Sequence, residues 1–376
     1  MRLKLITSSS FILFILLLSS GAGRTRIASP ETDLFQEHAN PKLGKMIEMG
    51  PQALLNDYRH AKDRPGLGMD YSVTPSWEFA DVLTDSVDFG WAQEFGSQTM
   101  PSTDKLTGLT VDPTGNVYVT GYSDFVWLTM KYDASGTLLW SQTYAEPGIT
   151  DTYGEDILVD AAGNVFVSGY RWGPFIDSDI LLIKYDPSGV EQWVADYAGA
   201  GLNNDFPNAM ALDSAGNVFI GGYSYSATVD ADFMTLKFDS EGNLLWDRLF
   251  NGSAWSDDWI TDIALDDSAN VYVAGVTADD ENNDDFGIIK YSADGTTVWI
   301  TQFDGITGTD WANSIAVDAA GKTYVTGVSQ HYDDYIDYYT LKLDSAGEEI
   351  WGIRWGVSGT GAGDSWASDI VVDDSL

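Results

Sequence analysis

The sequence predicts an all-β protein, a β-propeller made of four-stranded antiparallel blades, and three observations lead to this prediction. A block of the form D-x-x-G-N-V-Y/F-V-x-G, then apolar-x-L/I-K-Y/F/L-D-x-x-G-x-x-x-W, recurs five times. The tryptophans that close it are 53, 53, 53 and 52 residues apart, and they are Trp140, Trp193, Trp246, Trp299 and Trp351. A fixed period of this size is typical of solenoids and propellers, whose units bury apolar faces against their neighbours. Each block also holds four runs rich in β-branched and aromatic residues, as a propeller blade requires.

The third block shows how the strands are expected to follow one another. Its four runs are Ala209–Leu212, Val218–Tyr223, Phe233–Phe238 and Asn243–Phe250. Asp-x-x-Gly turns join strand one to two and strand three to four, because aspartate caps backbone donors and glycine accepts the left-handed conformation. The fourth block has Ala269 in place of the glycine and Ser292 in place of the aspartate. We therefore expect its turns to be the most strained.

The N-terminus has the features of a secretory signal peptide over residues 1–22. Arg2 and Lys4 precede an apolar run over residues 11–18, and small residues follow, with cleavage expected after Ala22. The apolar run is too short to span a bilayer comfortably. The sequence therefore predicts export, to the cell envelope or the extracellular space.

Two further segments complete the predicted organisation. Residues 23–87 lack the block and are interpreted as a linker or leader with a short helix over Met46–Tyr58. Residues 88–376 form the propeller domain. Residues 89–95 are predicted to be a fourth strand without its own first three, of the kind that pairs with the last blade to close a ring. The final residues stop where the next turn glycine is expected, so we predict five complete blades, partial ones, and an incomplete ring in a C-terminally truncated chain.

Composition excludes several classes of function. The chain has 57 acidic and 19 basic residues, a formal charge of −38, and no cluster of Lys or Arg that could bind nucleic acid or an anionic membrane. The charge favours cations or cationic partners. There is no cysteine and there are only three histidines, so thiolate chemistry is excluded and histidine-based triads or metal sites are disfavoured.

Residues that repeat in every block are interpreted as structural. Each block has one lysine in its third strand, and in four of the five blocks an aspartate follows two positions later on the same strand face, so we expect an ion pair between them. The closing tryptophans are expected to pack between adjacent sheets. The same interpretation covers an aromatic position just before strand one, which is occupied by Tyr153, Phe206, Trp259, Trp311 and Trp366. The lysines are Lys131, Lys184, Lys237, Lys290 and Lys342.

The block resembles the SBBP-type β-propeller repeats of secreted bacterial proteins. The resemblance rests on the DAAGNVFVSG run at residues 160–169, the ILLIKYDPSGVEQW run at residues 180–193, and their counterparts across residues 88–376. It implies a scaffold of about seven blades, and it supplies no catalytic residues. A weaker likeness to quinoprotein-type propellers rests on the turn glycine followed by a tryptophan.

Function is expected on the face that carries the loops between strands two and three and the links between blades, because the tight turns occupy the other face. Three alternatives remain open there. Acidic loops could bind Ca²⁺ through Asp279, Asp280, Asp284, Asp285, Asp333, Asp334 and Asp337. Aromatic side chains could bind a glycan or a protein, and the candidates are Trp172, Phe175, Tyr225, Tyr332 and Tyr335. A carboxylate pair could hydrolyse glycosides, and Glu155 and Glu281 are the non-repeating candidates.

The links between blades add further carboxylates on this face, namely Asp151, Asp205, Asp257, Asp258 and Asp310. The interpretation that fits the repeats best is an exported, non-catalytic binding scaffold for an extracellular protein or glycan, with Ca²⁺ as the candidate cofactor. The alternative is a propeller enzyme that acts on glycans, or a quinoprotein-like propeller.

Overall fold

A computed structural model describes residues 3–8, 12–17, 93–94, 103–173, 176–199, 204–225, 230–252, 256–278, 283–305, 308–330, 336–355 and 365–373. The chain divides into two compact units, Met1–Phe95 and Gly96–Leu376. Within the described residues, no helix is long and apolar enough to cross a membrane. The predicted helix over Met46–Tyr58 lies outside the described residues, and the signal peptide stays a prediction.

The described part of the first unit contains three short strands. β1 (Leu3–Ser8) and β2 (Ile12–Leu17) form an antiparallel hairpin, and β3 (Gln93–Glu94) pairs with β2. β3 lies inside the strand predicted over residues 89–95. Its described partners are Ile12 and Leu13. The expectation that this strand pairs with the last blade to close a ring stays a prediction.

The described residues of the second unit form five four-stranded antiparallel sheets, and in each of them the strands follow chain order. Blade 1 is β4 (Asp104–Val111), β5 (Val117–Ser123), β6 (Val126–Tyr132) and β7 (Leu138–Tyr144). Blade 2 is β8 (Asp151–Val159), β9 (Val165–Gly173), β10 (Ile176–Tyr185) and β11 (Glu191–Tyr197). Blade 3 is β12 (Asp205–Leu212), β13 (Val218–Tyr225), β14 (Ala231–Phe238) and β15 (Leu244–Phe250). Blade 4 is β16 (Trp259–Leu265), β17 (Val271–Ala278), β18 (Asp284–Tyr291) and β19 (Thr297–Phe303). Blade 5 is β20 (Asp310–Val317), β21 (Thr323–Gln330), β22 (Ile336–Leu343) and β23 (Glu349–Trp355).

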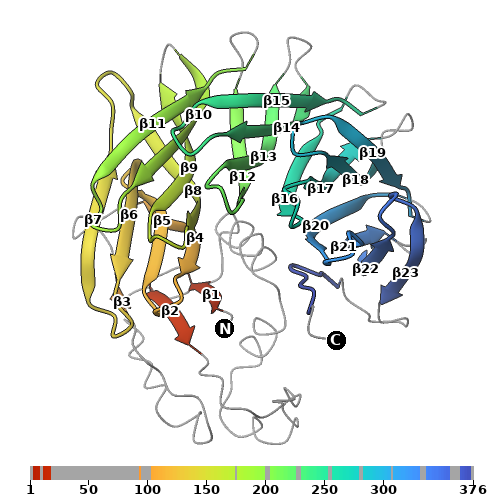
Figure 1. The fold of residues 1–376 in the computed structure, drawn as a ribbon, viewed down its shortest axis with the longest axis horizontal. Helices are drawn as coiled ribbons and strands as arrows, with labels where there is room; N and C mark the ends of the chain where they lie inside the picture. Colours follow the sequence, from red (N-terminus) through yellow and green to blue (C-terminus); the bar gives the residue numbers. More distant parts are fainter. Residues whose placement is uncertain are drawn as a thin grey trace, which may run out of the picture. The chain divides into compact units, whose positions relative to one another are not determined.

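The first strands of successive blades lie side by side, β4 against β8, β8 against β12, β12 against β16 and β16 against β20. Figure 1 shows the five sheets following one another in this order, and among the described residues the series does not close. The prediction of five complete four-stranded blades in an incomplete ring is therefore confirmed. Truncation as its cause stays a prediction.

The apolar core lies between neighbouring sheets. One cluster joins Phe166 and Ile180 of blade 2 to Val218, Met234 and other residues of blade 3, all of them buried. Every residue of the third strand β14 is buried, whereas the fourth strand β15 alternates between exposed and half-buried residues. Burial on both faces of the middle strands is what the apolar runs of the block require, because each sheet is covered by a neighbour.

The tight turns match the predicted chemistry, with one difference. Asp213 accepts hydrogen bonds from the backbone N–H groups of Ala215 and Asn217, and Gly216 has a φ of 81°. Ala269 occupies the equivalent position of blade 4 with a φ of 56°, so the expected strain at this turn is confirmed. The second irregular turn, at Ser292, is capped differently, because Asp294 accepts a hydrogen bond from the Thr296 N–H.

The repeated lysines and tryptophans join each blade to the next one. Lys184 Nζ and Trp193 Nε1 both donate to the backbone oxygen of Ser240 in blade 3, over 3.1 and 3.2 Å. Lys184 also lies over the ring of Phe166, with its Nζ 5.0 Å from the centroid. We refer to this arrangement as the blade clip. Equivalent pairs of donors reach Pro187 O from Lys131 and Trp140, and Ala293 O from Lys237 and Trp246.

The blade clip corrects the expected ion pair between the lysine and the aspartate two positions later. None of the ion pairs among the described residues joins these two side chains. The aspartate is occupied in its own turn, as Asp186 is by the N–H groups of Ser188 and Val190, and the lysine extends to the neighbouring blade instead. The structural interpretation of the tryptophans is confirmed, since Trp140 packs against Tyr185 of the next blade at 6.0 Å between ring centroids.

Residues 365–373 lie against blade 5 as the first strand of a further blade would. Asn313 donates to Ala367 O over 2.7 Å, just as Asn208 of blade 3 donates to Ile260 O of blade 4. The backbone N–H of Ser365 donates to Ile336 O. The contacts that join one first strand to the next therefore continue beyond the fifth sheet.

Candidate functional site

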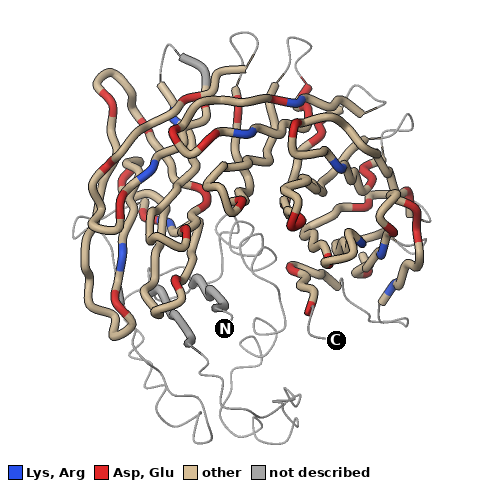
Figure 2. The backbone as a smooth tube through the Cα atoms, viewed as in Figure 1, with Lys and Arg blue, Asp and Glu red and all other residues tan. Residues whose placement is uncertain are grey.

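The face that carries the blade links and the loops between second and third strands combines aromatic and acidic side chains. Figure 2 shows how acidic positions outnumber basic ones along the described backbone of the propeller unit. Its main features are a row of aromatic rings, a cleft at one end of that row, and several aspartates in or next to the strands.

A row of aromatic rings runs across blades 1 to 3, and we refer to it as the aromatic ladder. It consists of Tyr122, Tyr153, Tyr170, Phe206 and Tyr223, each of them half-buried. Successive ring centroids are 4.8, 4.9, 4.9 and 5.1 Å apart, in alternating edge-on and more nearly parallel contacts. The members come from first strands (β8, β12) and from second strands (β5, β9, β13). Aromatic pairs at such separations stabilise the contact between blades, while the exposed part of each ring remains open to a ligand.

The aromatic ladder ends in a cleft between blades 3 and 4, which we refer to as the aromatic cleft. Tyr223, Tyr225, Ala231, Asp257 and Trp259 line a volume of about 230 Å³. Tyr223 and Tyr225 stand almost perpendicular to each other, at 79° and 5.8 Å between centroids. Asp257 is exposed, and its Oδ1 accepts a hydrogen bond from the Ala231 N–H over 2.9 Å.

Glu155 lies on β8, two residues after Tyr153 of the aromatic ladder, and burial together with the charge of Glu155 raises the pKa of Tyr170. Burial raises the pKa of its carboxyl group, the charge of Lys105 lowers it, and the charge of Asp156 raises it further. Burial raises the pKa of Tyr223 to about 12, and the charges of Tyr225, Glu155 and Asp257 contribute. The tyrosines of the ladder are therefore neutral hydrogen-bond donors at any physiological pH.

Glu155 occupies a position at which the other first strands carry a hydrogen-bond donor to the next blade. Thr107 donates to Gly154 O, Asn208 to Ile260 O and Thr261 to Ala312 O. A carboxyl group can donate such a bond only when it is protonated. Of the two glutamates that the sequence suggests for acid–base chemistry, Glu155 therefore differs from the residues at the same position in the other blades. Glu281 lies outside the described residues.

Buried aspartates at the starts of first strands hold the links between blades. Asp258 is fully buried, and its carboxylate accepts the N–H groups of Gly252 and Ala278 over 2.7 and 2.9 Å. Burial raises the pKa of Asp258 to about 6, although these two hydrogen bonds lower it. Asp205 and Asp310 accept the N–H groups of Gly199 and Gly305 in the same way.

A second set of aspartates, which are half-buried, joins adjacent first strands. Asp156 Oδ2 accepts the N–H of Met210 in blade 3, and Asp262 Oδ2 accepts the N–H of Ile315 in blade 5. Burial raises the pKa of Asp156 to about 6 and raises that of Asp262 as well. These carboxylates accept hydrogen bonds from main-chain N–H groups, so their role is structural.

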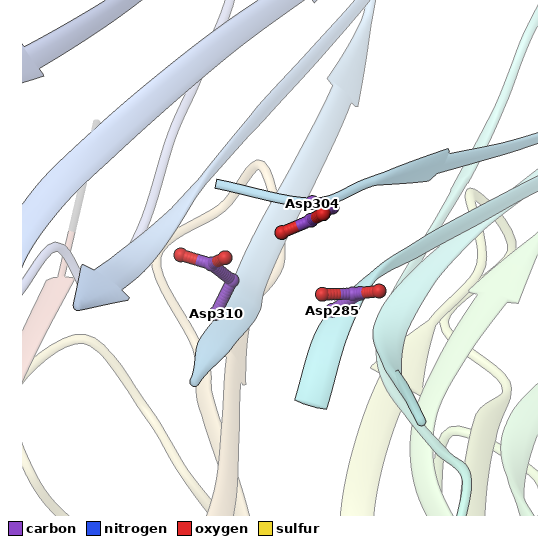
Figure 3. A group of neighbouring side chains, drawn as sticks. All are labelled: Asp285, Asp304 and Asp310. Carbon is purple, nitrogen blue, oxygen red and sulfur yellow. The ribbon is translucent and has the colours of Figure 1, made fainter. Parts of the chain in front are cut away.

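Three carboxylates meet between blades 4 and 5, and we refer to them as the acidic cluster. Asp285 is the second residue of β18, Asp304 follows β19 and Asp310 begins β20. One oxygen of each lies within 4.8 Å of the other two (Figure 3). Asp285 and Asp310 are buried and Asp304 is exposed. Oδ1 of Asp310 accepts no hydrogen bond from the described residues. Burial raises the pKa of Asp310, while hydrogen bonds and the charge of Arg354 lower it.

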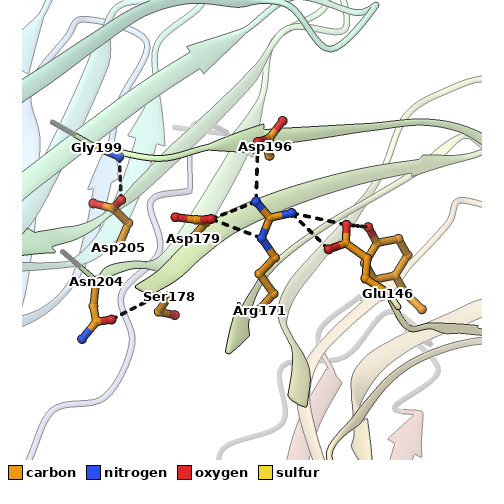
Figure 4. Close-up of polar contacts among 9 residues, drawn as sticks. Glu146, Arg171, Ser178, Asp179, Asp196, Gly199, Asn204 and Asp205 are labelled. Carbon is orange, nitrogen blue, oxygen red and sulfur yellow. Dashed lines mark hydrogen bonds and ion pairs between the residues drawn. The ribbon is translucent and has the colours of Figure 1, made fainter. Parts of the chain in front are cut away.

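In two other blades, an arginine places a positive charge beside the aspartate that corresponds to Asp285. Arg171 forms ion pairs with Asp179 at 2.8 Å and with Glu146 at 3.1 Å, and it lies 3.7 Å from Asp196 (Figure 4). Asp179 corresponds in the repeat to Asp285 of the acidic cluster. Arg354 lies 3.7 Å from Asp337, the corresponding residue of blade 5. In blade 4, Thr277 occupies the second-strand position of Arg171, and Gln302 occupies the fourth-strand position of Arg354.

The structure separates the residues that the sequence nominated for calcium. Asp285 belongs to the acidic cluster, but Asp284 accepts a hydrogen bond from Trp311 Nε1 over 2.9 Å, and Asp337 faces Arg354. The remaining candidates, Asp279, Asp280, Asp333 and Asp334, lie outside the described residues. Asp304 was not nominated, because an isolated aspartate after a fourth strand gives no signal without knowledge of its neighbours.

The nominated aromatic residues also divide. Tyr225 lines the aromatic cleft, and Trp172 is 43% exposed at the end of β9. Phe175, Tyr332 and Tyr335 lie outside the described residues. The tyrosines of the second strands, such as Tyr170 and Tyr223, were missed. Each of them directly follows a glycine of the second strand, and this regular position was the only signal in the sequence. The signal is weak, because an apolar residue at the same position could equally well belong to the core.

Comparison with known proteins supports the repeat and the fold. Residues 90–125 and 192–227 match the SBBP beta-propeller repeat, so the chain carries repeats of this family. Each matched segment begins just before a block tryptophan, Trp91 or Trp193. No curated protein matches the sequence.

Similar solved structures include a glucose dehydrogenase, at 13% identity and a TM-score of 0.39 over 67% of this chain and 88% of that one. A gluconolactonase of Xanthomonas campestris has 15% identity and a TM-score of 0.35, over 58% and 68% of the two chains. The apocarotenoid oxygenase of Synechocystis has 11% identity and a TM-score of 0.43, over 70% and 65%. Likeness at this level carries no conclusion about activity or cofactor.

Proposed function

We propose that this chain is an exported, non-catalytic binding scaffold whose ligand lies along the aromatic ladder, and that the ligand is a glycan. The observation that carries the proposal is the ladder itself, a row of half-buried rings in contact across three blades. An elongated ligand with apolar faces and polar edges, such as an oligosaccharide, could stack on the rings and accept hydrogen bonds from their hydroxyl groups. Export rests on the N-terminal sequence pattern and on the repeat family.

The non-catalytic part of the proposal is supported by the structural roles of three buried or half-buried aspartates. Asp156, Asp258 and Asp262 each accept hydrogen bonds from main-chain N–H groups that hold strands or blades together. A general acid or base must instead be within reach of a substrate proton. The high negative charge favours a ligand that carries positive charge, and amino sugars combine such a charge with stackable faces.

The proposal is tested by retention on insoluble polysaccharides of different charge: chitosan, cellulose and alginate. We expect retention on chitosan that persists at a salt concentration high enough to screen exposed charges. Tyr122→Leu and Tyr170→Leu, which remove rings from the ladder, should each weaken retention several-fold. Trp355→Leu is the matched control, because Trp355 is 62% exposed on β23 and outside the ladder. Retention that disappears with salt, or that both ladder variants preserve, contradicts glycan binding at this place.

We also propose that the acidic cluster holds a calcium ion that stiffens the junction between blades 4 and 5. Three carboxylates from three different segments provide the hard oxygen ligands that Ca²⁺ prefers. Oδ1 of the fully buried Asp310 accepts no hydrogen bond from the described residues, so a cation would satisfy it. Arg354 donates to Ser329, and its positive charge partly compensates the negative charge of Asp310. A guanidinium group has no lone pair to offer a metal ion, so it cannot act as a ligand.

Thermal unfolding with calcium and then with excess chelator tests the calcium proposal. At a free calcium concentration of about 100 times Kd, the folded state gains about 2.7 kcal/mol, which corresponds to a rise of several degrees in Tm. Asp304→Asn should abolish most of that rise. Asp267→Asn is the control, because Asp267 is an exposed turn residue and its loss changes the net charge equally. An equal calcium response in both variants, or none in the wild type, rules the site out.

A glycan-active enzyme is the second candidate, and Glu155 is the observation that favours it. Its pKa is raised by burial, as that of a general acid must be, and it lies beside the rings that would hold the sugar. Hydrolysis of chitosan oligosaccharides that is lost in Glu155→Gln, while retention on chitosan is unchanged, would replace the scaffold with the enzyme. Retention without hydrolysis supports the scaffold.

A further inference from the structure

We propose that the aromatic cleft between blades 3 and 4 binds an alkylated ammonium group, such as the trimethylammonium head of choline. The inference rests on the proposed binding function and deepens it, because it names the ligand class at one end of the aromatic ladder. Four features of the cleft carry it: the rings, their arrangement, the carboxylate, and the size of the space.

The rings come from two blades and surround a common volume. Tyr223 and Tyr225 extend from the end of β13, and Trp259 begins β16 of the next blade. The two tyrosines are nearly perpendicular, so they form two walls rather than one flat surface. Ala231 leaves the space between the rings open because its side chain is only a methyl group. A cation among several aromatic faces is attracted by the ring quadrupoles, by about 0.5–2 kcal/mol for each favourable contact.

The charge of the cleft is negative. Asp257 lines it, and the hydrogen bond from the Ala231 N–H holds its carboxylate at the edge of the rings. The described residues that line the cleft include no lysine or arginine. An alkylated ammonium group offers both a positive charge and apolar methyl surface, and it is weakly hydrated compared with a bare ammonium. It therefore matches rings and carboxylate together, whereas a metal ion would require more oxygen ligands.

Comparison with the neighbouring junctions shows which residues set the cleft apart. One blade earlier, Tyr170, Trp172 and Phe206 are the equivalent rings, but Asn204 stands in place of Asp257. Asn204 makes the same hydrogen bond, to the N–H of Ser178, without a charge (Figure 4). One blade later, Val276 and Ala278 replace the two tyrosines. Among these three junctions, only that of the cleft combines three rings with a carboxylate.

The size of the cleft agrees with a small head group. A volume of about 230 Å³ is below the usual range of pockets for drug-sized molecules, which begins at about 300 Å³. It accommodates one substituted ammonium group, with the rest of the ligand directed outward or along the ladder. The same chemistry occurs in choline-bearing molecules and in methylated lysine side chains.

Isothermal titration calorimetry with choline and with its uncharged isostere, 3,3-dimethylbutan-1-ol, tests the inference on the full chain. We expect choline to bind at least tenfold more tightly than the isostere at low ionic strength. Trp259→Leu and Tyr225→Leu should each weaken choline binding at least tenfold, and Asp257→Asn should weaken it several-fold. Trp172→Leu is the matched control, since Trp172 lies at the uncharged equivalent junction, and this variant should bind choline as the wild type does.

The outcomes separate this inference from the proposed function. Choline binding no tighter than that of the isostere, or undetectable in a folded wild-type protein, overturns the inference. If chitosan retention persists in that case, the binding scaffold stands without its cation site. Choline binding without polysaccharide retention supports the cleft and contradicts the glycan.

A trimethyl-lysine peptide, compared with its unmethylated form, then shows whether the head group is carried by a protein or by a choline-bearing molecule. If all three cleft variants fail to fold by circular dichroism, protection of Trp259 from oxidation by choline in the wild type decides the matter.

Discussion

The blade clip makes a quantitative prediction about how neighbouring blades are held together. Lys184 and Trp193 of blade 2 both donate to the same acceptor, the backbone oxygen of Ser240 in blade 3. Lys184→Met and Trp193→Phe each remove one donor while keeping most of the apolar volume. Their combination leaves the oxygen without either partner, so the two substitutions should not act independently.

The magnitude follows from the contacts. Loss of the neutral indole donor should cost about 1 kcal/mol, and loss of the charged lysine donor about 1.5–2 kcal/mol, including its contact with the Phe166 ring. In either single variant the Ser240 oxygen keeps one hydrogen bond. In the double variant it loses both, which adds about 1 kcal/mol because water compensates only in part at this half-buried position. We expect the double variant to be less stable than the sum of the single effects by about that amount.

The assay is a double-mutant cycle by urea unfolding, with the free energy of unfolding measured for the wild type and the three variants. The same substitutions in blade 5, Lys342→Met and Trp351→Phe, are the control. There, no described residue supplies a shared backbone acceptor, and we expect additive effects. Additivity within about 0.5 kcal/mol in blade 2 would refute the idea of a shared acceptor.

Two further predictions concern stability. Ala269→Gly should stabilise the protein by about 0.5–1 kcal/mol, because Ala269 has a φ of 56°, and urea unfolding should show the opposite sign for Ala162→Gly in the equivalent turn of blade 2. The protein should also become more stable as the pH falls from 7 to about 5. Burial raises the pKa of Asp156 and Asp258 from 3.8 to about 6, so the folded state binds these protons more readily than the unfolded state does. Between pH 7 and pH 5 each group should contribute about 1.3 kcal/mol, which is lost again as the pH rises through 6. A urea midpoint that does not increase between pH 7.5 and pH 5, or that Asp156→Asn leaves equally dependent on pH, would contradict this assignment.

The sequence alone determined the unit of the fold and most of its strands. The second strand of blade 3 was predicted over Val218–Tyr223 and is observed over Val218–Tyr225. Turn positions were equally predictable, because Asp-x-x-Gly specifies its own backbone conformation within a few residues. The first strand of this blade, predicted over Ala209–Leu212, in fact begins at Asp205. A register shift between Pro207 and Ala209 interrupts the alternation of buried and exposed residues on which the prediction depended.

Only the tertiary structure decided which side chains meet. Lys184 was expected to pair with an aspartate two residues away, yet it contacts a backbone oxygen 56 residues along the chain. Asp304 joins Asp285 and Asp310, and Trp259 lines one cleft with Tyr225, through the packing of one sheet against the next. Local sequence fixes strands and turns because their hydrogen bonds are short in range. Contacts between blades depend on the distance and twist that separate two sheets, and a single sequence does not state these.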